Sequence, residues 1–239
     1  ALASLSGEAD ADWARAGAPS AGAAFLGGIS LDGPTREAAR ELVARDRSEF
    51  LPDDPVAFVD EQLAALADAP IRAGFNVRTT TLDPLARVAD ICAESDAIIE
   101  VNAHCRQDEM CRAGAGETLL ADSARLCEQV ATASEQGAVV SVKVRTEVPG
   151  VDLPNLCARV ERAGADILHV DAMDSEPVVG HVADATDCFV VANNGVRDRA
   201  TGPGVSRTRR RRRQRRPTER RPGGARQGSG GNDSVVRGQ

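Results

Sequence analysis

The sequence predicts an α/β protein of the (β/α)8 TIM-barrel class that is incomplete after its seventh strand. Two observations predict this fold: short apolar runs alternate with amphipathic helical patterns along residues 1–199, and no G-x-G-x-x-G motif follows the first run. Such alternation gives a parallel sheet, and seven or more units in ~200 residues favour a closed barrel over an open doubly wound sheet. The chain has 239 residues, of which 42% are hydrophobic, so it can bury a substantial core.

Seven apolar runs are the candidate strands. Each is short and is followed by polar or glycine-containing sequence, which is typical of buried strands in a parallel sheet. The runs are Leu2–Ser6, Ala21–Ile29, Ile71–Arg78, Ala97–Val101, Ala138–Arg145, Asp166–Asp171 and Cys188–Ala192.

The helices between these runs carry recognisable start and stop signals. Asp54-Pro55 and Asp83-Pro84 each indicate a helix start, because Asp caps free N–H groups and proline lacks the N–H that a first helical turn leaves unpaired. A further helix is expected to open near Gly116. Gly137 and Gly164 each come just before a strand, where a helix needs a residue in the left-handed conformation.

The net charge of −7 is the sum of two unlike parts. Residues 1–200 hold 17 basic and 34 acidic side chains, a net charge of −17, and Lys143 is the single lysine of the chain. A dense acidic surface with so little lysine keeps a protein hydrated in concentrated salt. We interpret the chain as a halophile protein; the alternative is an ordinary acidic protein.

The C-terminal segment has the opposite charge. Residues 201–239 hold 12 arginines against two acidic side chains, and residues 207–216 are almost all arginine. We therefore divide the chain into a barrel domain, residues 1–199, and an Arg/Gly/Pro-rich disordered tail, residues 200–239. Either this tail is an arm that binds RNA phosphates, or the reading frame has been lost near residue 200; the absence of aromatic residues for stacking favours a frameshift.

The sequence also predicts the compartment and the absence of a metal site. No apolar run approaches the ~20 residues of a membrane span, and the N-terminus lacks a signal-peptide pattern, so we expect a cytoplasmic protein. The cysteines form no C-x-x-C pair and no metal-ligand spacing, which fits reduced thiols. They are Cys92, Cys105, Cys111, Cys127, Cys157 and Cys188.

In a barrel the chemistry sits at the carboxyl ends of the strands, and several of these ends are polar. A lysine within the apolar strand around Lys143 is costly to bury unless it meets an anion or an electron-rich ring. The alternative is a salt bridge to Glu100 or Asp171. The polar strand ends are residues 4–7, 76–78, 102–105, 143–145, 169–171 and 193–195.

Two motifs carry a resemblance to a known family. Residues 99–105 end in Asn-Ala-His-Cys, and residues 114–120 read Gly-Ala-Gly-Glu-Thr-Leu-Leu. This order is similar to that of the dihydrouridine synthases, in which a strand ends in Asn-x-Gly-Cys-Pro before a Gly-x-Gly-x-x-Leu-Leu helix start. Further matches at residues 3–7, 76, 142–145 and 192–196 extend the resemblance over residues 1–199, closest to the archaeal branch. The chain departs from the pattern at His104 and Arg106, and Asp171 stands where the family has a flavin-contacting histidine.

The resemblance implies an FMN-dependent oxidoreductase that reduces uridine in tRNA to dihydrouridine, with NAD(P)H as the electron donor. Hydride would pass from the flavin to C6 of uracil, and Cys105 would protonate C5. The resemblance also implies substrate contacts from Asn102 and Arg145. The implied FMN contacts are Ser4, Leu5, Asn76, Lys143, Asp171, Asn193 and Gly195.

Alternatives remain at the level of both function and residues. The Asn-x-x-Cys loop is also similar to that of dihydroorotate dehydrogenases, which are FMN barrels acting on a small pyrimidine. A chain without an eighth strand and its phosphate loop could instead be a catalytically inactive or RNA-binding protein. Cys105 could be an apolar filler, Asn76 and Asn102 could cap strand ends, and Arg145 could be a solvated charge on the rim.

Overall fold

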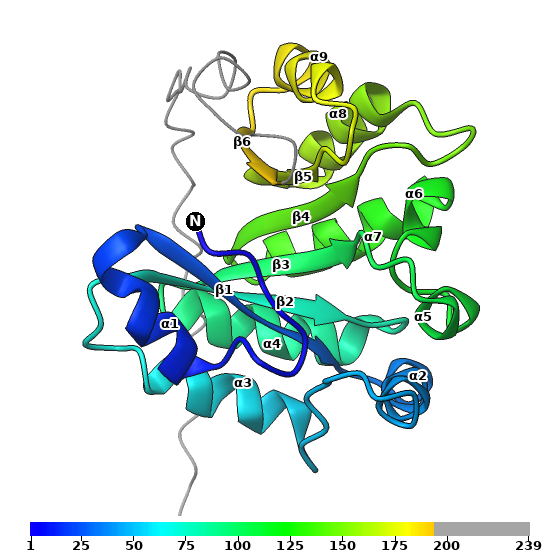
Figure 1. Cartoon of the computed structure of the whole chain (residues 1–239). Coiled ribbons are helices and arrows are strands. Elements are labelled where there is room, and N and C mark those ends of the chain that lie inside the picture. Colours follow the sequence, from blue (N-terminus) through cyan, green and yellow to red (C-terminus); the bar gives the residue numbers. More distant parts are fainter. Residues whose placement is uncertain (194–239) are drawn as a thin grey trace, which may run out of the picture. The chain divides into compact units, whose positions relative to one another are not determined.

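The computed structural model describes residues 1–193, which form a parallel sheet of six strands surrounded by helices (Figure 1). The strands pair in chain order, and all five pairings are parallel. Their carboxyl ends lie on the side where Figure 1 places α2, α5 and α6. The strands are β1 (Ala23–Ser30), β2 (Arg72–Arg78), β3 (Ile98–Ala103), β4 (Val139–Arg145), β5 (Ile167–Asp171) and β6 (Phe189–Asn193).

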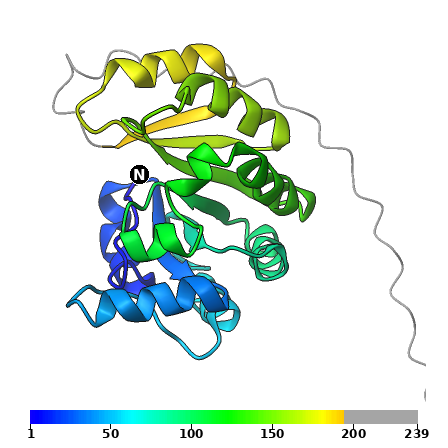
Figure 2. The same ribbon diagram turned by 90° about the vertical axis from the view of Figure 1, so that its right-hand side faces the viewer.

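The helices follow one another around the outside of the curved sheet (Figure 2). None of the helices within residues 1–193 has the length and apolar character of a membrane-spanning segment. They are α1 (Ala11–Gly17), the 3-10 helix η1 (Ala18–Ser20), α2 (Gly33–Val43), α3 (Pro55–Ala64), α4 (Leu82–Glu94), α5 (Asp108–Arg112), α6 (Thr118–Ala121), α7 (Ser123–Glu135), α8 (Leu153–Ala163) and α9 (Pro177–Ala185).

Residues of the strands alternate between an apolar outer face and a polar inner face. Outward side chains such as Ile99, Val142 and Leu168 are buried in one core with the apolar residues of the helices. The residues between them are polar and are buried as well, among them Glu100 and Lys143. A buried polar face must supply its own hydrogen-bond partners or hold a ligand.

The sheet curls, so that strands far apart in the pairing order meet across its inner face. The ring centroids of Phe25 on β1 and His169 on β5 are 5.5 Å apart, although three strands separate β1 from β5. Within residues 1–193 the sheet stays open between β1 and β6. The parallel α/β class is thus confirmed, with six strands and without barrel closure in the described range.

The first expected strand is wrong. Leu2 forms an isolated parallel bridge with Ala24, and the chain then turns through Gly7, which has a φ of +73°, into an antiparallel bridge between Ala9 and Gly27. The physical reason is that the run is too poor in buried apolar side chains to make a strand, since its second leucine, Leu5, is 49% exposed. The segment follows the edge of β1 without becoming part of the sheet.

Most of the predicted helix signals are confirmed. Asp54 caps α3 by accepting hydrogen bonds from the next N–H groups, and Gly137 and Gly164 adopt φ values of +86° and +122°. Asp83 lies inside α4, whose cap position is Thr81, because the helix starts two residues earlier than expected. The helix expected near Gly116 is divided at Asp122 into α6 and α7. The expected tail, residues 200–239, lies outside the described residues.

Truncation of Phe25 tests the curled arrangement. Phe25 is 2% exposed, so Phe25→Ala should lower the free energy of unfolding by about 3–5 kcal/mol, because the cavity removes the contact between β1 and β5. Phe189, at the outer end of β6, is 50% exposed, and Phe189→Ala should change the free energy of unfolding by no more than about 0.5 kcal/mol. Chemical denaturation measures both, and equal losses would contradict the arrangement.

Candidate functional site

The inner face is organised around the buried carboxylate of Glu100 on β3. Its Oε1 accepts a hydrogen bond from Asn76 Nδ2 at 2.8 Å, and its Oε2 accepts one from Ser141 Oγ at 2.9 Å. His169 Nδ1 lies 2.9 Å from the same Oε2. An ionised carboxylate can only accept, so His169 carries a proton on Nδ1. Glu100 therefore joins β2, β3, β4 and β5.

Glu100 stays ionised despite its complete burial. Burial favours the neutral acid, but His169, the charge of Lys143 and the hydrogen bond from Asn76 outweigh this effect, so the pKa of Glu100 lies below its usual value. The core of the site thus contains a negative charge at neutral pH.

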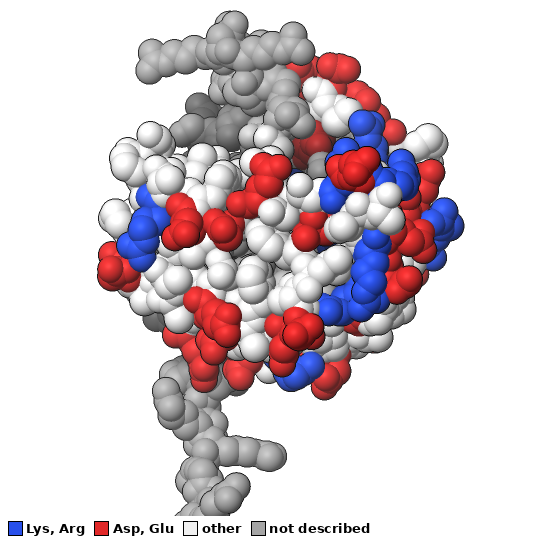
Figure 3. Space-filling view, turned by 60° about the horizontal axis from the view of Figure 1, so that its bottom comes forward, with Lys and Arg blue, Asp and Glu red and all other residues white. Residues whose placement is uncertain are grey.

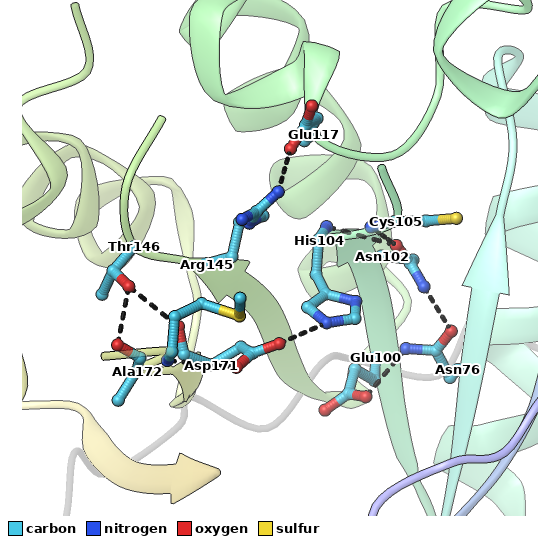
Figure 4. Close-up of polar contacts among 11 residues, drawn as sticks. Asn76, Glu100, Asn102, His104, Cys105, Glu117, Arg145, Thr146, Asp171 and Ala172 are labelled. Atoms are coloured by element: carbon cyan, nitrogen blue, oxygen red, sulfur yellow. Dashed lines mark hydrogen bonds and ion pairs between the residues drawn. The ribbon is translucent and has the colours of Figure 1, made fainter. Parts of the chain in front are cut away.

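A chain of amides connects Glu100 to the loop that follows β3 (Figure 4). Asn76 Oδ1 accepts a hydrogen bond from Asn102 Nδ2 at 2.9 Å. Asn102 Oδ1 in turn accepts from the backbone N–H of His104 at 3.2 Å and from that of Cys105 at 2.9 Å. The position of the loop is therefore set from inside the sheet.

His104 and Asp171 form a bridge across the carboxyl end of β4. His104 Nε2 lies 2.6 Å from Asp171 Oδ2, joining the loop after β3 to the end of β5 (Figure 4). The side chain of Asp171 is 5% exposed, whereas that of His104 is 29% exposed. One edge of an imidazole held by a buried carboxylate thus faces the opening of the site.

Lys143 on β4 pairs with His169, two residues before Asp171, and is only 4% exposed. Neither a hydrogen bond nor an ion pair within 4.0 Å joins its amine to any of residues 1–193. The salt bridge considered from the sequence, to Glu100 or Asp171, is therefore not formed in this part of the chain. The neighbouring Arg145 differs, because its Nη1 donates to Glu117 Oε2 at 2.7 Å. Arg145 is thus an ion-paired side chain rather than a solvated charge on the rim.

Cys105 is half-buried at the opening. Its backbone carbonyl accepts the N–H of Glu117 at 2.9 Å, and its thiol points away from His104 (Figure 4). Its side chain packs against a small apolar cluster between α2 and α5. That cluster consists of Ala38, Ala39, Leu42 and Met110.

The remaining residues expected in the site come from residues 4–5 and 193–195, near the two ends of the predicted barrel domain. Ser4 and Leu5 lie in the irregular segment before α1, because the strand expected there is absent. Asn193 ends β6 opposite Asp171, and its carbonyl accepts the N–H of Ala172 at 2.8 Å. Gly195 lies outside the described residues.

The sequence analysis included residue 78 among the polar strand ends but gave Arg78 no role, and it missed the central role of Glu100. Arg78 is a buried side chain at the end of β2 that donates to Glu49 at 2.7 Å and to Ser6. Its pKa is raised, because the neighbouring charges, Glu49 foremost, outweigh the desolvation that would lower it. Both residues share a signal that could have revealed them: each is a charged side chain within an otherwise apolar strand.

The surface near the site carries both signs of charge. Lys and Arg side chains gather on the right in Figure 3, the side on which Figure 1 places α2 and α5 (Figure 3). Three arginines of these elements and the turn after α2 form ion pairs with glutamates, which limits the positive potential of this side. The pairs are Arg40–Glu37, Arg45–Glu109 and Arg112–Glu41.

Comparisons with known proteins agree with the motifs. Residues 70–173 match the sequence model of the family Dihydrouridine synthase (Dus), which confirms the predicted resemblance. An uncharacterized protein of Methanocaldococcus jannaschii is 27% identical over 207 residues, covering 82% of this chain and 79% of the relative. The matched segment runs from before β2 to just after β5 and so contains the Glu100 network and the His104–Asp171 bridge.

Two solved structures resemble the fold. The crystal structure of 2,3-dimethylmalate lyase aligns with a TM-score of 0.53 at 10% identity, covering 80% of this chain and 65% of the lyase chain. A putative lyase/mutase from Burkholderia cenocepacia aligns with a TM-score of 0.51 at 14% identity, covering 82% of this chain and 69% of that chain. This chain thus spans just under two thirds of the lyase, and at such low identity both structures show the fold alone.

The buried charge of Glu100 makes a prediction about stability and pH. Glu100→Gln should lower the free energy of unfolding at pH 7 by about 2–4 kcal/mol, because it leaves His169 without its carboxylate partner and removes the negative charge near Lys143. A depressed pKa stabilises the fold above the ordinary value of 4.5 and loses this effect as the pH falls through the folded value. The difference between wild type and variant should therefore shrink below pH 4.5. Denaturation across pH measures it, with the exposed Glu128→Gln as control; a constant difference would contradict an ionised Glu100.

Proposed function

We propose that this chain, which belongs through residues 70–173 to the dihydrouridine synthase family, is an FMN-dependent enzyme that reduces uridine in tRNA to dihydrouridine. The observation that carries the proposal is Lys143, a buried amine without a protein partner in the described range, next to a polar strand-end site. A buried ammonium is costly unless an anion or an electron-rich group meets it. A flavin presents such a group at its pyrimidine edge.

The residues present fit FMN at this position. Lys143 would neutralise charge on the reduced ring. Reduced FMN, when bound, supplies a hydride. We assign further contacts with the cofactor to Ser4, Leu5, Asn76, Asp171, Asn193 and Gly195. Asn76 would act through its remaining N–H, because its other polar groups bind Glu100 and Asn102.

The residues of the loop after β3 would handle the substrate. As hydride adds to C6 of the uracil ring, the thiol of Cys105 would give its proton to C5, so that the C5–C6 double bond becomes a single bond and the flavin is oxidised. NAD(P)H would then return two electrons to the flavin. Asn102 would hold the loop through its hydrogen bond from the N–H of Cys105 and would also contact the base. Arg145, held by its ion pair with Glu117, would contact the RNA backbone.

A pocket of about 330 Å³ beside Arg145 supports an extended substrate. Thr146, Val151, Val178 and His181 are among its lining residues, so it combines apolar walls with polar edges next to the site. A nucleotide adjacent to the reacting uridine has space there. The acidic composition and single lysine further support our proposal that the protein works in the cytoplasm of a salt-adapted archaeon.

The role of Lys143 is testable through cofactor binding alone. Purified protein should carry FMN absorbance, and Lys143→Met should weaken FMN binding at least about tenfold, because the anionic edge loses its countercharge. Since Lys143 is the single lysine of this sequence, lysine labelled with ¹³C at Cε gives one side-chain NMR signal, which FMN should shift. Arg87→Met, on the exposed face of α4, is the matched control. An unshifted signal would remove Lys143 from the cofactor site.

The role of Cys105 can be tested by measuring dihydrouridine formation in tRNA. Cys105→Ala should retain FMN but lower the rate of dihydrouridine formation at least about 100-fold, because the proton donor is lost. Mass spectrometry of nucleosides from treated, unmodified tRNA measures the product. Cys127→Ala, which alters a half-buried thiol on α7, should behave as wild type. Full activity of the Cys105 variant would show that this residue serves only in packing. Turnover of orotate and dihydroorotate in place of tRNA would change the substrate class.

A further inference from the structure

The reaction proposed above assigns no role to the contact between His104 and Asp171. Its geometry is that of a histidine oriented by a carboxylate: Nε2 lies 2.6 Å from Asp171 Oδ2, and the carboxylate is almost fully buried. An ionised carboxylate accepts, so Nε2 carries a proton. Nδ1 forms no hydrogen bond with any of residues 1–193, and the ring is 29% exposed. The ring is thus fixed on one side and open on the other.

The bridge crosses the end of β4, the strand that carries Lys143. In the register of the sheet Asn102 is opposite Lys143, and Arg145 is opposite Asp171. A contact from the loop after β3 to the end of β5 must therefore cross the end of β4 (Figure 4). The same Asn102 oxygen holds the backbone N–H groups of His104 and Cys105.

Three groups near the ring have contacts of their own. Arg145 on β4 is paired with Glu117, the charge of Lys143 acts on Glu100, and the thiol of Cys105 points toward α2 and α5. Asp171 is the acidic group in direct contact with the ring. His104 thus presents the free edge of its ring at this opening, in the same loop as the exposed Arg106.

We propose that His104, oriented by Asp171, is a second catalytic residue that donates a hydrogen bond from Nδ1 to the O4 carbonyl oxygen of the uracil ring. The inference rests on the proposed function. When a hydride adds to C6, the electron pair of the C5–C6 double bond moves toward C5 and O4, and the imidazolium stabilises the negative charge that develops on O4. The charge disappears when C5 takes the proton from Cys105. His104 itself ends the step unchanged, so no additional reactant is needed.

The test separates the two half-reactions of the FMN-loaded full chain. His104→Phe keeps an aromatic ring without a donor, and His104→Asn keeps a neutral donor. With His104→Phe, reoxidation of the reduced flavin by an unmodified tRNA transcript should slow about 100-fold. His104→Asn should recover part of that loss. Flavin content and the rate of flavin reduction by NADPH should match wild type in both variants, and so should all rates in the control Glu128→Gln, which alters an exposed side chain on α7.

Asp171 is a positioning residue, and its test needs a second readout. Asp171→Asn should slow reoxidation about tenfold, because the His104 ring loses the carboxylate that orients it. Independently of turnover, the ¹⁵N signals of the His104 ring, identified by their loss in His104→Asn, should shift when the tRNA transcript binds. The chain has three histidines, which keeps this assignment simple.

The outcomes distinguish the inference from the proposed function. If wild type binds FMN and forms dihydrouridine while both His104 variants reoxidise at the wild-type rate, the role of His104 is overturned and the proposed function stands. If wild type forms no dihydrouridine at all, both are overturned. A loss confined to flavin content or to reduction by NADPH would assign His104 to the cofactor and equally overturn its role toward O4.

Discussion

The structure depends on one constraint, which is the ionised carboxylate of Glu100 inside a parallel sheet. A charge in that position is tolerated only when hydrogen-bond donors and opposite charges surround it. Asn76, Ser141 and His169 supply the donors from three other strands, and Lys143 supplies charge. Because these partners come from β2, β4 and β5, satisfying one carboxylate fixes the relative positions of four strands.

The same constraint extends to the opening of the site. Asn76 binds Glu100 through its N–H and Asn102 through its oxygen, and Asn102 then holds the backbone of His104 and Cys105. The loop after β3 is therefore held by a buried hydrogen-bond network inside the sheet, which is the kind of support that an accurately positioned site requires. An asparagine suits this role because one side of its amide donates and the other accepts.

The strands of the sheet could be predicted from the sequence, whereas contacts between strands that are not neighbours depended on how the sheet curves. The apolar runs predicted all six strands, since burial on both faces of a parallel sheet leaves a pattern in the sequence. Leu2–Ser6 failed as a strand because two leucines do not reveal whether both are buried. The strand-end rule brought Asn102, Lys143 and Asp171 together, whereas the pairing of His104 with Asp171 required the register of three strands. Ion pairing of Arg145 likewise depended on how the loop before α6 returns to β4.

The single lysine is best understood from the physical difference between its amine and a guanidinium. This chain uses arginine where a cation pairs with an exposed acid, as at Arg40, Arg72 and Arg112. A guanidinium carries five donors in a rigid plane, and each donor buried without a partner would cost free energy. An amine presents a compact charge at the end of a flexible aliphatic chain, so it can face the edge of a ring with fewer hydrogen-bond donors that need acceptors. The exception at position 143 therefore follows from the chemistry of a buried, water-poor site, where one compact cation is easier to satisfy than a planar one.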